Sequence, residues 1–245
     1  MCGMSINSAL GVGIAVALAI SACARSDAPV LVSGTVSGTV TFEGEAPKAD
    51  SLSISEAGSQ GCCEPGAKVD DTDRSQLIDE NGGIANVVIA LTFEGAEVVL
   101  PSEPVVVELK GCRFEPHLTV VHVGTSVSWE HSDAISHNIH IYTLKNEAWS
   151  TTVPPFSKRE QTLMGAEAIR LGCDIHPWME SYVYVTEATH FTLTGTDGSF
   201  KIEGVPPGEY KLEIWHERLG KGRGTVTVNA DGSSEAIAVQ MRGAR

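Results

Sequence analysis

The sequence contains a short stretch that is rich in metal-binding side chains. Cys173, His176 and Met179 follow one another at the spacing C-x-x-H-x-x-M, and His137 lies further upstream. Together these residues offer one thiolate, two imidazole nitrogens and a thioether. Two histidines and a cysteine with a weak axial methionine form the ligand set of a copper ion that transfers electrons. The residues therefore predict a site for one copper ion, held by His137, Cys173, His176 and Met179.

The segments around these residues have the pattern of strands joined by loops. Residues 168–172 alternate between apolar and polar types just before Cys173, and His137 begins a strand-like segment with Asn138 beside it. A ligand loop between two strands, with a histidine from the end of a neighbouring strand, is a geometry that a β-sandwich can build. The alternative is that Cys173 and Met179 are ordinary core residues, because both types are commonly buried.

The central part of the chain has the pattern of an all-β protein. Short apolar or alternating runs recur about every ten residues with turn residues between them, whereas helix signals are scarce. The sequence predicts strands over residues 86–91, 105–109, 118–123, 125–130, 138–142, 159–163, 168–172 and 181–185, and a polar loop over residues 143–158. This series of short strands is typical of a Greek-key β-sandwich.

At the ligand residues the chain resembles the cupredoxins, the family of plastocyanin and amicyanin. The short ligand loop, with Pro177 after the histidine, is most similar to that of amicyanin. The resemblance implies one type 1 copper with the four ligands named above. It also implies that Asn138 ties the two ligand loops together by hydrogen bonding. The run from Glu130 to Asp133 departs from the family pattern, which often has an asparagine a few residues before the first ligand.

The C-terminal part has a different pattern. Residues 191–240 alternate cleanly and contain the turn Thr196-Asp197-Gly198 and the sequence VPPGEYKLEIWHERLG. This tail resembles the carboxypeptidase-regulatory-like domain, a small transthyretin-like β-sandwich. The first strand usual in that domain is absent from the tail but fits residues 33–40. We therefore expect the N-terminal strand to complete the tail sandwich, with the cupredoxin as an insertion. The alternative is that residues 33–47 pair with the cupredoxin sheet.

These motifs occur in the same order in two-domain secreted bacterial proteins called methylamine-utilisation-like, a label that is not evidence of a role in methylamine metabolism. We expect the chain to divide into a lipoprotein signal peptide (1–23), a linker (24–32), the first strand of the C-terminal sandwich (33–47), a long polar loop (48–82), a cupredoxin-like domain (83–187) and a carboxypeptidase-regulatory-like domain (188–242).

The N-terminus has the pattern of an export signal. Apolar residues 9–20 end at small residues before Cys23. The sequence Ile-Ser-Ala-Cys resembles the bacterial lipobox, which implies a lipid anchor on Cys23, although no basic residue precedes Arg25. We expect a periplasmic or cell-surface protein anchored to the membrane by its lipid. If the cell is Gram-negative, Ala24 after the cysteine resembles a signal for sorting to the outer membrane. A plain cleaved signal or an uncleaved anchor is the alternative.

Export makes disulfides permissible. If Cys2 is removed with the signal peptide, Cys23 carries lipid and Cys173 holds metal, then Cys62, Cys63 and Cys112 remain, which allows one disulfide and one free thiol. Either Cys62 or Cys63 can pair with Cys112, because the sequence does not fix the connectivity. A reduced, buried Cys112 is an equal alternative.

The other histidines are expected to have structural or surface roles. His140 lies three residues after His137, and this odd spacing puts it on the opposite face of a strand. His131 is expected near the rim of the metal site. Structural or surface positions are expected for the remaining ones, which are His117, His122, His190 and His216.

The charge and the missing motifs exclude several classes of function. The formal net charge of −14 argues against nucleic-acid binding and suits a carrier that meets a basic patch on its partner. The sequence has no G-x-S-x-G, H-E-x-x-H or phosphate-loop motif. Four ligands leave no open position on the metal, so we expect no enzymatic activity.

The sequence thus predicts an exported, membrane-anchored copper protein that transfers electrons to or from a redox partner such as a cytochrome or a dehydrogenase. An exposed edge of His176 is expected to conduct the electron, and Pro177 and Trp178 are expected to form part of an apolar docking rim. One alternative is a protein that binds or delivers copper without redox traffic. Another is a surface binding or adhesion module without metal.

Overall fold

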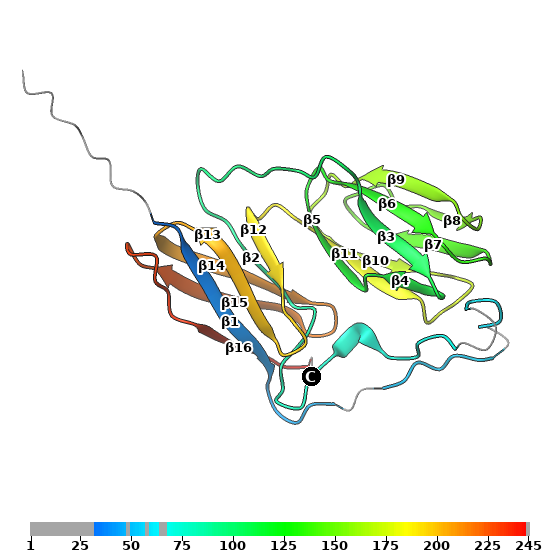
Figure 1. Cartoon of the computed structure of the whole chain (residues 1–245), viewed down its shortest axis with the longest axis horizontal. Helices are drawn as coiled ribbons and strands as arrows, with labels where there is room; N and C mark the ends of the chain where they lie inside the picture. The colour runs from blue at the N-terminus through cyan, green and yellow to red at the C-terminus, as the bar shows by residue number, and fades with distance from the viewer. Residues whose placement is uncertain (1–31, 48–49, 57–58, 64–67, 244–245) are drawn as a thin grey trace, which may run out of the picture. The chain divides into compact units, whose positions relative to one another are not determined.

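The computed structural model describes residues 32–47, 50–56, 59–63 and 68–243. All of them belong to one compact unit, Leu31–Arg245. The described residues form β-strands and one short 3-10 helix, which confirms the predicted all-β class (Figure 1). No helix among them is long and apolar enough to cross a membrane. The predicted signal peptide and Cys23 lie outside the described residues.

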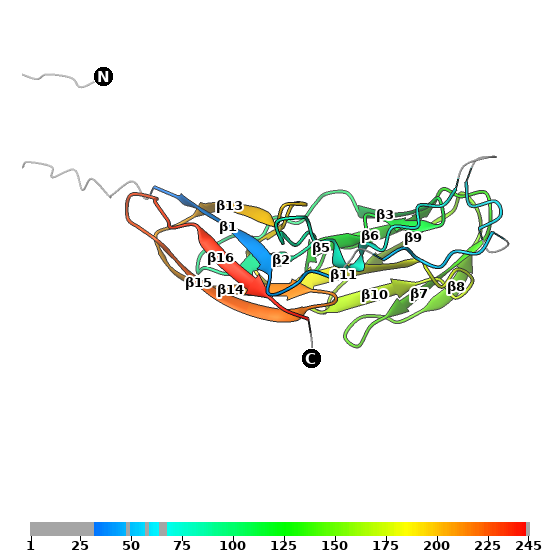
Figure 2. The same cartoon turned by 90° about the horizontal axis from the view of Figure 1, so that it is seen from below.

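Nine strands form the larger of two β-sandwiches, here called the metal-site sandwich. One sheet has the order β5-β11-β10-β7-β8, and the other has the order β4-β3-β6-β9. Figure 2 shows these sheets as two layers. The strands of the first sheet are β5 (Leu118–His122), β11 (Glu180–Thr186), β10 (Ala168–Gly172), β7 (His137–Tyr142) and β8 (Ser150–Val153). Those of the second are β4 (Arg113–Glu115), β3 (Val105–Lys110), β6 (Ser126–His131) and β9 (Lys158–Thr162).

The core of the metal-site sandwich follows from the alternation in its strands. Val107 and Leu109 of β3 face Ile139 and Ile141 of β7 across one apolar cluster, and all are almost completely buried. Two strands, β4 and β8, were not predicted from the sequence. The short strand β8 lies at a sheet edge within the expected polar loop. Three of its four residues are polar, so its sequence lacks the alternation of apolar and polar residues that predicts a strand.

The remaining strands form the tail sandwich. Its sheets have the orders β13-β1-β16 and β12-β2-β14-β15. Their strands are β1 (Gly34–Phe42), β13 (Ser199–Val205), β16 (Ile237–Met241), β12 (His190–Leu193), β2 (Val88–Leu91), β14 (Gly208–His216) and β15 (Gly220–Val228). The N-terminal strand β1 pairs antiparallel with β13 and parallel with β16, so it lies in the tail sandwich.

Strand β2 corrects the predicted domain boundary. The sequence analysis places residues 83–91 in the cupredoxin-like domain, but β2 pairs with β12 and β14 of the tail sandwich. Ile89 and Leu91 pack into the tail core, whereas Val88 packs against Leu118 and Trp215 on the other face. A strand covered on both faces is apolar throughout, so its sequence does not show which sheet it joins.

The expected long polar loop, residues 48–82, is attached to the metal-site sandwich at several points. It contains the 3-10 helix η1 (Arg74–Gln76). The guanidinium group of Arg113 in β4 donates hydrogen bonds to the carbonyl oxygens of Asp70 (2.9 Å) and Thr72 (3.1 Å). Arg74 forms an ion pair with Glu115 at 2.7 Å. A disulfide between Cys62 and Cys112 adds a covalent link.

Candidate metal centre

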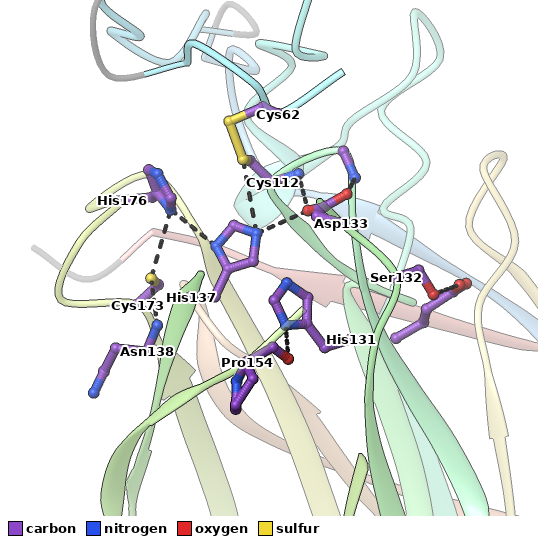
Figure 3. Close-up of polar contacts among 12 residues, drawn as sticks. Cys62, Cys112, His131, Ser132, Asp133, His137, Asn138, Pro154, Cys173 and His176 are labelled. Atoms are coloured by element: carbon purple, nitrogen blue, oxygen red, sulfur yellow. Dashed lines mark hydrogen bonds and ion pairs between the residues drawn. A yellow bond between two sulfur atoms is a disulfide. The ribbon is translucent and has the colours of Figure 1, made fainter. Parts of the chain in front are cut away.

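Two neighbouring strands bring the predicted ligands together. His137 is the first residue of β7, and Cys173 directly follows β10. These strands are antiparallel, with Gly172 opposite His140, so the start of β7 lies beside the end of β10. The ligand loop is closed by backbone hydrogen bonds from Met179 to His176 (2.9 Å) and from Cys173 to Met179 (3.3 Å). This turn places His176 above the end of the two strands (Figure 3).

The metal-binding atoms of three residues converge. The Nδ1 atoms of His137 and His176 are 2.9 Å apart, and the Cys173 Sγ lies 3.7 Å from the Nδ1 of His176. All three ligand atoms lie within 4.8 Å of one another, and all three residues are buried. Because metal bonds to imidazole nitrogen and thiolate sulfur are about 2.0 and 2.3 Å long, one ion can contact all three atoms.

Asp133 orients His137 and was missed by the sequence analysis. Its carboxylate lies 2.8 Å from the Nε2 of His137, and this contact orients the ring so that its Nδ1 faces the Nδ1 of His176 at 2.9 Å. The backbone N–H groups of Gly111 (2.6 Å) and Cys112 (2.8 Å) donate to the same carboxylate. The one available signal was an acidic residue four positions before the histidine, in the run that departs from the cupredoxin pattern.

The electrostatics of the site favour a cation at its centre. Burial raises the pKa of Asp133, but hydrogen bonds from His137 and two backbone N–H groups outweigh burial and leave the pKa below its usual value. Burial also raises the pKa of Cys173, yet hydrogen bonds from His137 and backbone N–H groups lower it overall. Burial and the nearby His137 lower the pKa of His176, which keeps its ring neutral. Burial lowers the pKa of His137, but the hydrogen bonds and charges of Asp133 and Cys173 raise it overall, so a metal ion bound at its Nδ1 would take the place of a proton.

Asn138 links the strands around the site. Its backbone N–H points at the Cys173 Sγ at 3.4 Å, and its side-chain oxygen accepts a hydrogen bond from the backbone of Asp174 at 3.4 Å. Its side-chain nitrogen donates to the Ser150 hydroxyl at 3.1 Å. These contacts join β7 to β8 and to the ligand loop, which is the kind of role that the cupredoxin resemblance implies for Asn138.

Met179, the predicted axial ligand, lies at the end of the ligand loop. It is only 1% exposed and belongs to the same buried cluster as Cys173. Its backbone atoms form both hydrogen bonds that close the loop.

His176 corrects the prediction of an exposed imidazole edge, since it is only 4% exposed. The Trp178 ring packs at 5.1 Å from the His176 ring. The sulfurs of Cys62 and Cys112 lie within 4.8 Å of a ring nitrogen of His176. Cys62 comes from the long loop far upstream in the chain. The residues next to His176 in the sequence therefore do not predict that the disulfide covers its ring.

The disulfide resolves the alternatives left by the sequence. Cys62 pairs with Cys112, so the alternative of a reduced Cys112 is wrong, and Cys63 is free and partly buried. The Sγ of Cys112 lies 3.8 Å from the Nε2 of His137. The disulfide therefore packs directly against both histidines of the candidate metal centre (Figure 3).

The structure separates the other histidines from the ligand set. The His131 ring lies 4.9 Å from that of His137, and its Nδ1 donates to the carbonyl oxygen of Pro154 at 2.6 Å. His140 faces Asp174 at 3.2 Å and stacks on Tyr142. Outside the metal centre, His117 forms a buried ion pair with Glu217, and His216, His122 and His190 lie in or against the tail sandwich.

Searches of solved structures find similarity to copper proteins over part of the chain. A copper-containing nitrite reductase from Thermus scotoductus SA-01 is 23% identical, with a TM-score of 0.33, over 40% of this chain and 25% of that one. Amicyanin from Paracoccus versutus is 21% identical, with a TM-score of 0.31, over 40% of this chain and 97% of that one. The chain thus spans about a quarter of the reductase. No protein-family model and no curated protein matches the chain.

Proposed function

We propose that this protein is an electron carrier, and not an enzyme, with one type 1 copper ion held by His137, Cys173, His176 and Met179. The observation that carries the proposal is the convergence of the Cys173 sulfur and two histidine Nδ1 atoms within 4.8 Å in a buried site. A thiolate favours Cu(I), and imidazoles are acceptable to Cu(I) and Cu(II) alike. Such a site holds copper in both oxidation states.

The fixed surroundings of the ligands favour electron transfer over copper delivery. His137 and Cys173 are at most 5% exposed, and Asp133 and Asn138 hold them by hydrogen bonds. A ligand set that cannot move far changes little in geometry when the metal is oxidised or reduced. A delivery protein must instead release its ion, and burial of the ligands opposes release.

Trp178 is the proposed route for the electron. Its ring packs on His176, and its indole N–H donates to the carbonyl oxygen of Cys112 at 3.2 Å. Trp178 is only partly buried and, with Pro177, lines a pocket of about 210 Å³. We expect the redox partner, a cytochrome or a dehydrogenase, to dock there with a basic surface that complements the net charge of −14.

The proposed location is the outer membrane, through a lipid on Cys23. The apolar segment and the lipobox-like sequence before Cys23 support this. Cells supplied with a labelled fatty acid should attach the label to the wild-type protein and to Cys2→Ala, the matched control, but not to Cys23→Ala. An unmodified mature N-terminus at a residue other than Cys23 would refute the anchor.

Redox cycling of the copper-loaded protein tests the proposed function. The protein is reduced and reoxidised repeatedly in the presence of a Cu(I) chelator, while its visible absorption and its copper content are followed. An electron carrier should regain its absorption in every cycle and keep its copper. Loss of the copper to the chelator on the first reduction would indicate delivery instead.

A further inference from the structure

A second group of soft ligands lies beside the candidate metal centre. The sulfurs of Cys62 and Cys112 and a ring nitrogen of His176 lie within 4.8 Å of one another, and all three residues are buried (Figure 3). In the observed state the two sulfurs are bonded to each other, so neither is a thiolate. The thiolate is the form of cysteine that binds metals, so this group is closed to a metal while the disulfide persists.

We propose that reduction of the Cys62–Cys112 disulfide opens a second, Cu(I)-binding site formed by Cys62, Cys112 and His176. A dithiol donor supplies two electrons and two protons. The S–S bond breaks, two protein thiols form, and the donor becomes a disulfide. Each protein thiol then releases its proton when it binds the metal. Thiolate ligands select Cu(I), and imidazole also accepts it.

We expect these ligands to stay close to one another after reduction. Arg113, next to Cys112, holds the carbonyl oxygens of Asp70 and Thr72, so the long loop remains attached to β4 without the disulfide. The backbone N–H of Cys112 donates to Asp133, and its carbonyl oxygen accepts from Trp178. These contacts fix Cys112 beside His176, and the two freed sulfurs need only separate enough to admit an ion.

Cys63 provides the contrast within the same segment. It is adjacent to Cys62 in sequence, is a free thiol, and is only partly buried. It does not belong to the group whose ligand atoms lie within 4.8 Å of one another. Cys63 is therefore the matched control for the two cysteines of the proposed site.

The second site rests on the proposed function only through His176, which both sites use. Because a neutral imidazole has only one nitrogen with a free lone pair, the two sites compete for His176. The second site must therefore be measured in a protein whose first site is disabled. Cys173→Ser removes the thiolate of the first site and leaves Cys62, Cys112 and His176 unchanged.

The test compares oxidised and reduced Cys173→Ser protein. Anaerobic treatment with a phosphine, which becomes a phosphine oxide as it reduces the disulfide, is followed by removal of the phosphine and a thiol count. Cu(I) affinity is then measured by competition with bicinchoninate. We expect about two additional thiols and an increase in Cu(I) affinity of at least about a hundredfold, because two thiolates replace a disulfide.

Two further variants show which cysteine is responsible for the gain in Cu(I) affinity. In the Cys173→Ser background, Cys63→Ser should keep the gain in affinity and Cys112→Ser should lose it. A thiol count that does not rise, an unchanged affinity, or a gain that survives Cys112→Ser would overturn the proposal. The oxidised wild-type protein with Cu(II) reports separately on the first site, so failure of the electron-carrier function is distinguishable from failure of this inference.

Discussion

The two β-sandwiches bury different kinds of side chain. Among the described residues, twelve buried polar or charged residues lie between residues 105 and 186, whereas the tail sandwich has two, Thr194 and His216. The core of the tail sandwich is almost entirely aliphatic. Burial of polar groups is unfavourable unless they are paired, so the end of the metal-site sandwich carries a cost that a purely structural domain avoids.

The difference between the sandwiches indicates where the chemistry resides. Five of the buried polar residues gather at the candidate metal centre: His131, Asp133, His137, Asn138 and His176. Each has a hydrogen-bond partner there, and a bound cation would satisfy the converging nitrogens and sulfur further. The tail sandwich shows the opposite arrangement, because its core consists almost entirely of apolar side chains.

The largest expected effect is loss of the metal centre in Cys173→Ser. A hydroxyl is a poor replacement for a thiolate, so the visible charge-transfer absorption and the redox activity should disappear completely, while the circular dichroism of the folded protein stays the same. Cys63→Ser changes a cysteine outside the ligand set and should keep the absorption. A Cys173→Ser protein that keeps the visible absorption would contradict the assignment of Cys173 as a ligand.

A substitution in the core of the tail sandwich should lower stability and leave the metal centre unchanged. Ile89 of β2 is fully buried in the tail core, so Ile89→Ala should lower the free energy of unfolding by about 2–5 kcal/mol without changing the copper spectrum. Leu144→Ala is the control, because Leu144 is 97% exposed and its loss should change stability by less than about 0.5 kcal/mol. A shifted copper spectrum in Ile89→Ala would show that packing in the tail core affects the metal centre.

His216, a buried polar residue of the tail sandwich, gives a pH dependence. Its Nδ1 accepts hydrogen bonds from the backbone of Arg218 and Leu219, which requires an unprotonated Nδ1. Burial, with smaller contributions from the charges of His117 and Arg218, lowers its pKa from 6.5 to about 4. Between these values the unfolded chain binds more protons than the folded protein, so stability is full above pH 6.5 and falls as the pH drops toward 4.

The expected contribution of His216 is about 3 kcal/mol over that pH window. Denaturant unfolding at a series of pH values measures it. His216→Gln should flatten this part of the profile, whereas His140→Gln, a change at a partly exposed histidine, should retain it. A wild-type slope that persists in His216→Gln would assign the effect to other groups.

The smallest expected effect comes from Asp133→Asn. The amide has one acceptor oxygen and cannot replace all three hydrogen bonds that the carboxylate accepts from His137, Gly111 and Cys112. Copper should bind about 10- to 100-fold more weakly, and the absorption should survive because every ligand remains. Competition with a chelator measures the affinity, and Asp174→Asn, on the ligand loop, is the control. An unchanged affinity would show that Asp133 does not support His137.

Features set by local spacing were predictable from the sequence. The C-x-x-H-x-x-M loop and the alternation of its flanking strands depend on neighbouring residues. Features that depend on long-range packing were not. The disulfide that covers His176 joins Cys62 to Cys112. The carboxylate of Asp133 is held beside His137 by backbone N–H groups of Gly111 and Cys112, in the turn between β3 and β4. Strand β2 was assigned to the wrong sandwich because both of its faces are buried.

The most direct test of the metal centre is copper analysis together with the visible spectrum of the protein after addition of Cu(II) and removal of excess metal. The account predicts about one copper per chain and an intense thiolate-to-copper absorption that vanishes on reduction and returns on oxidation. A protein that retains no copper, or that binds copper without the thiolate absorption, would contradict the assignment of His137, Cys173 and His176 as its ligands.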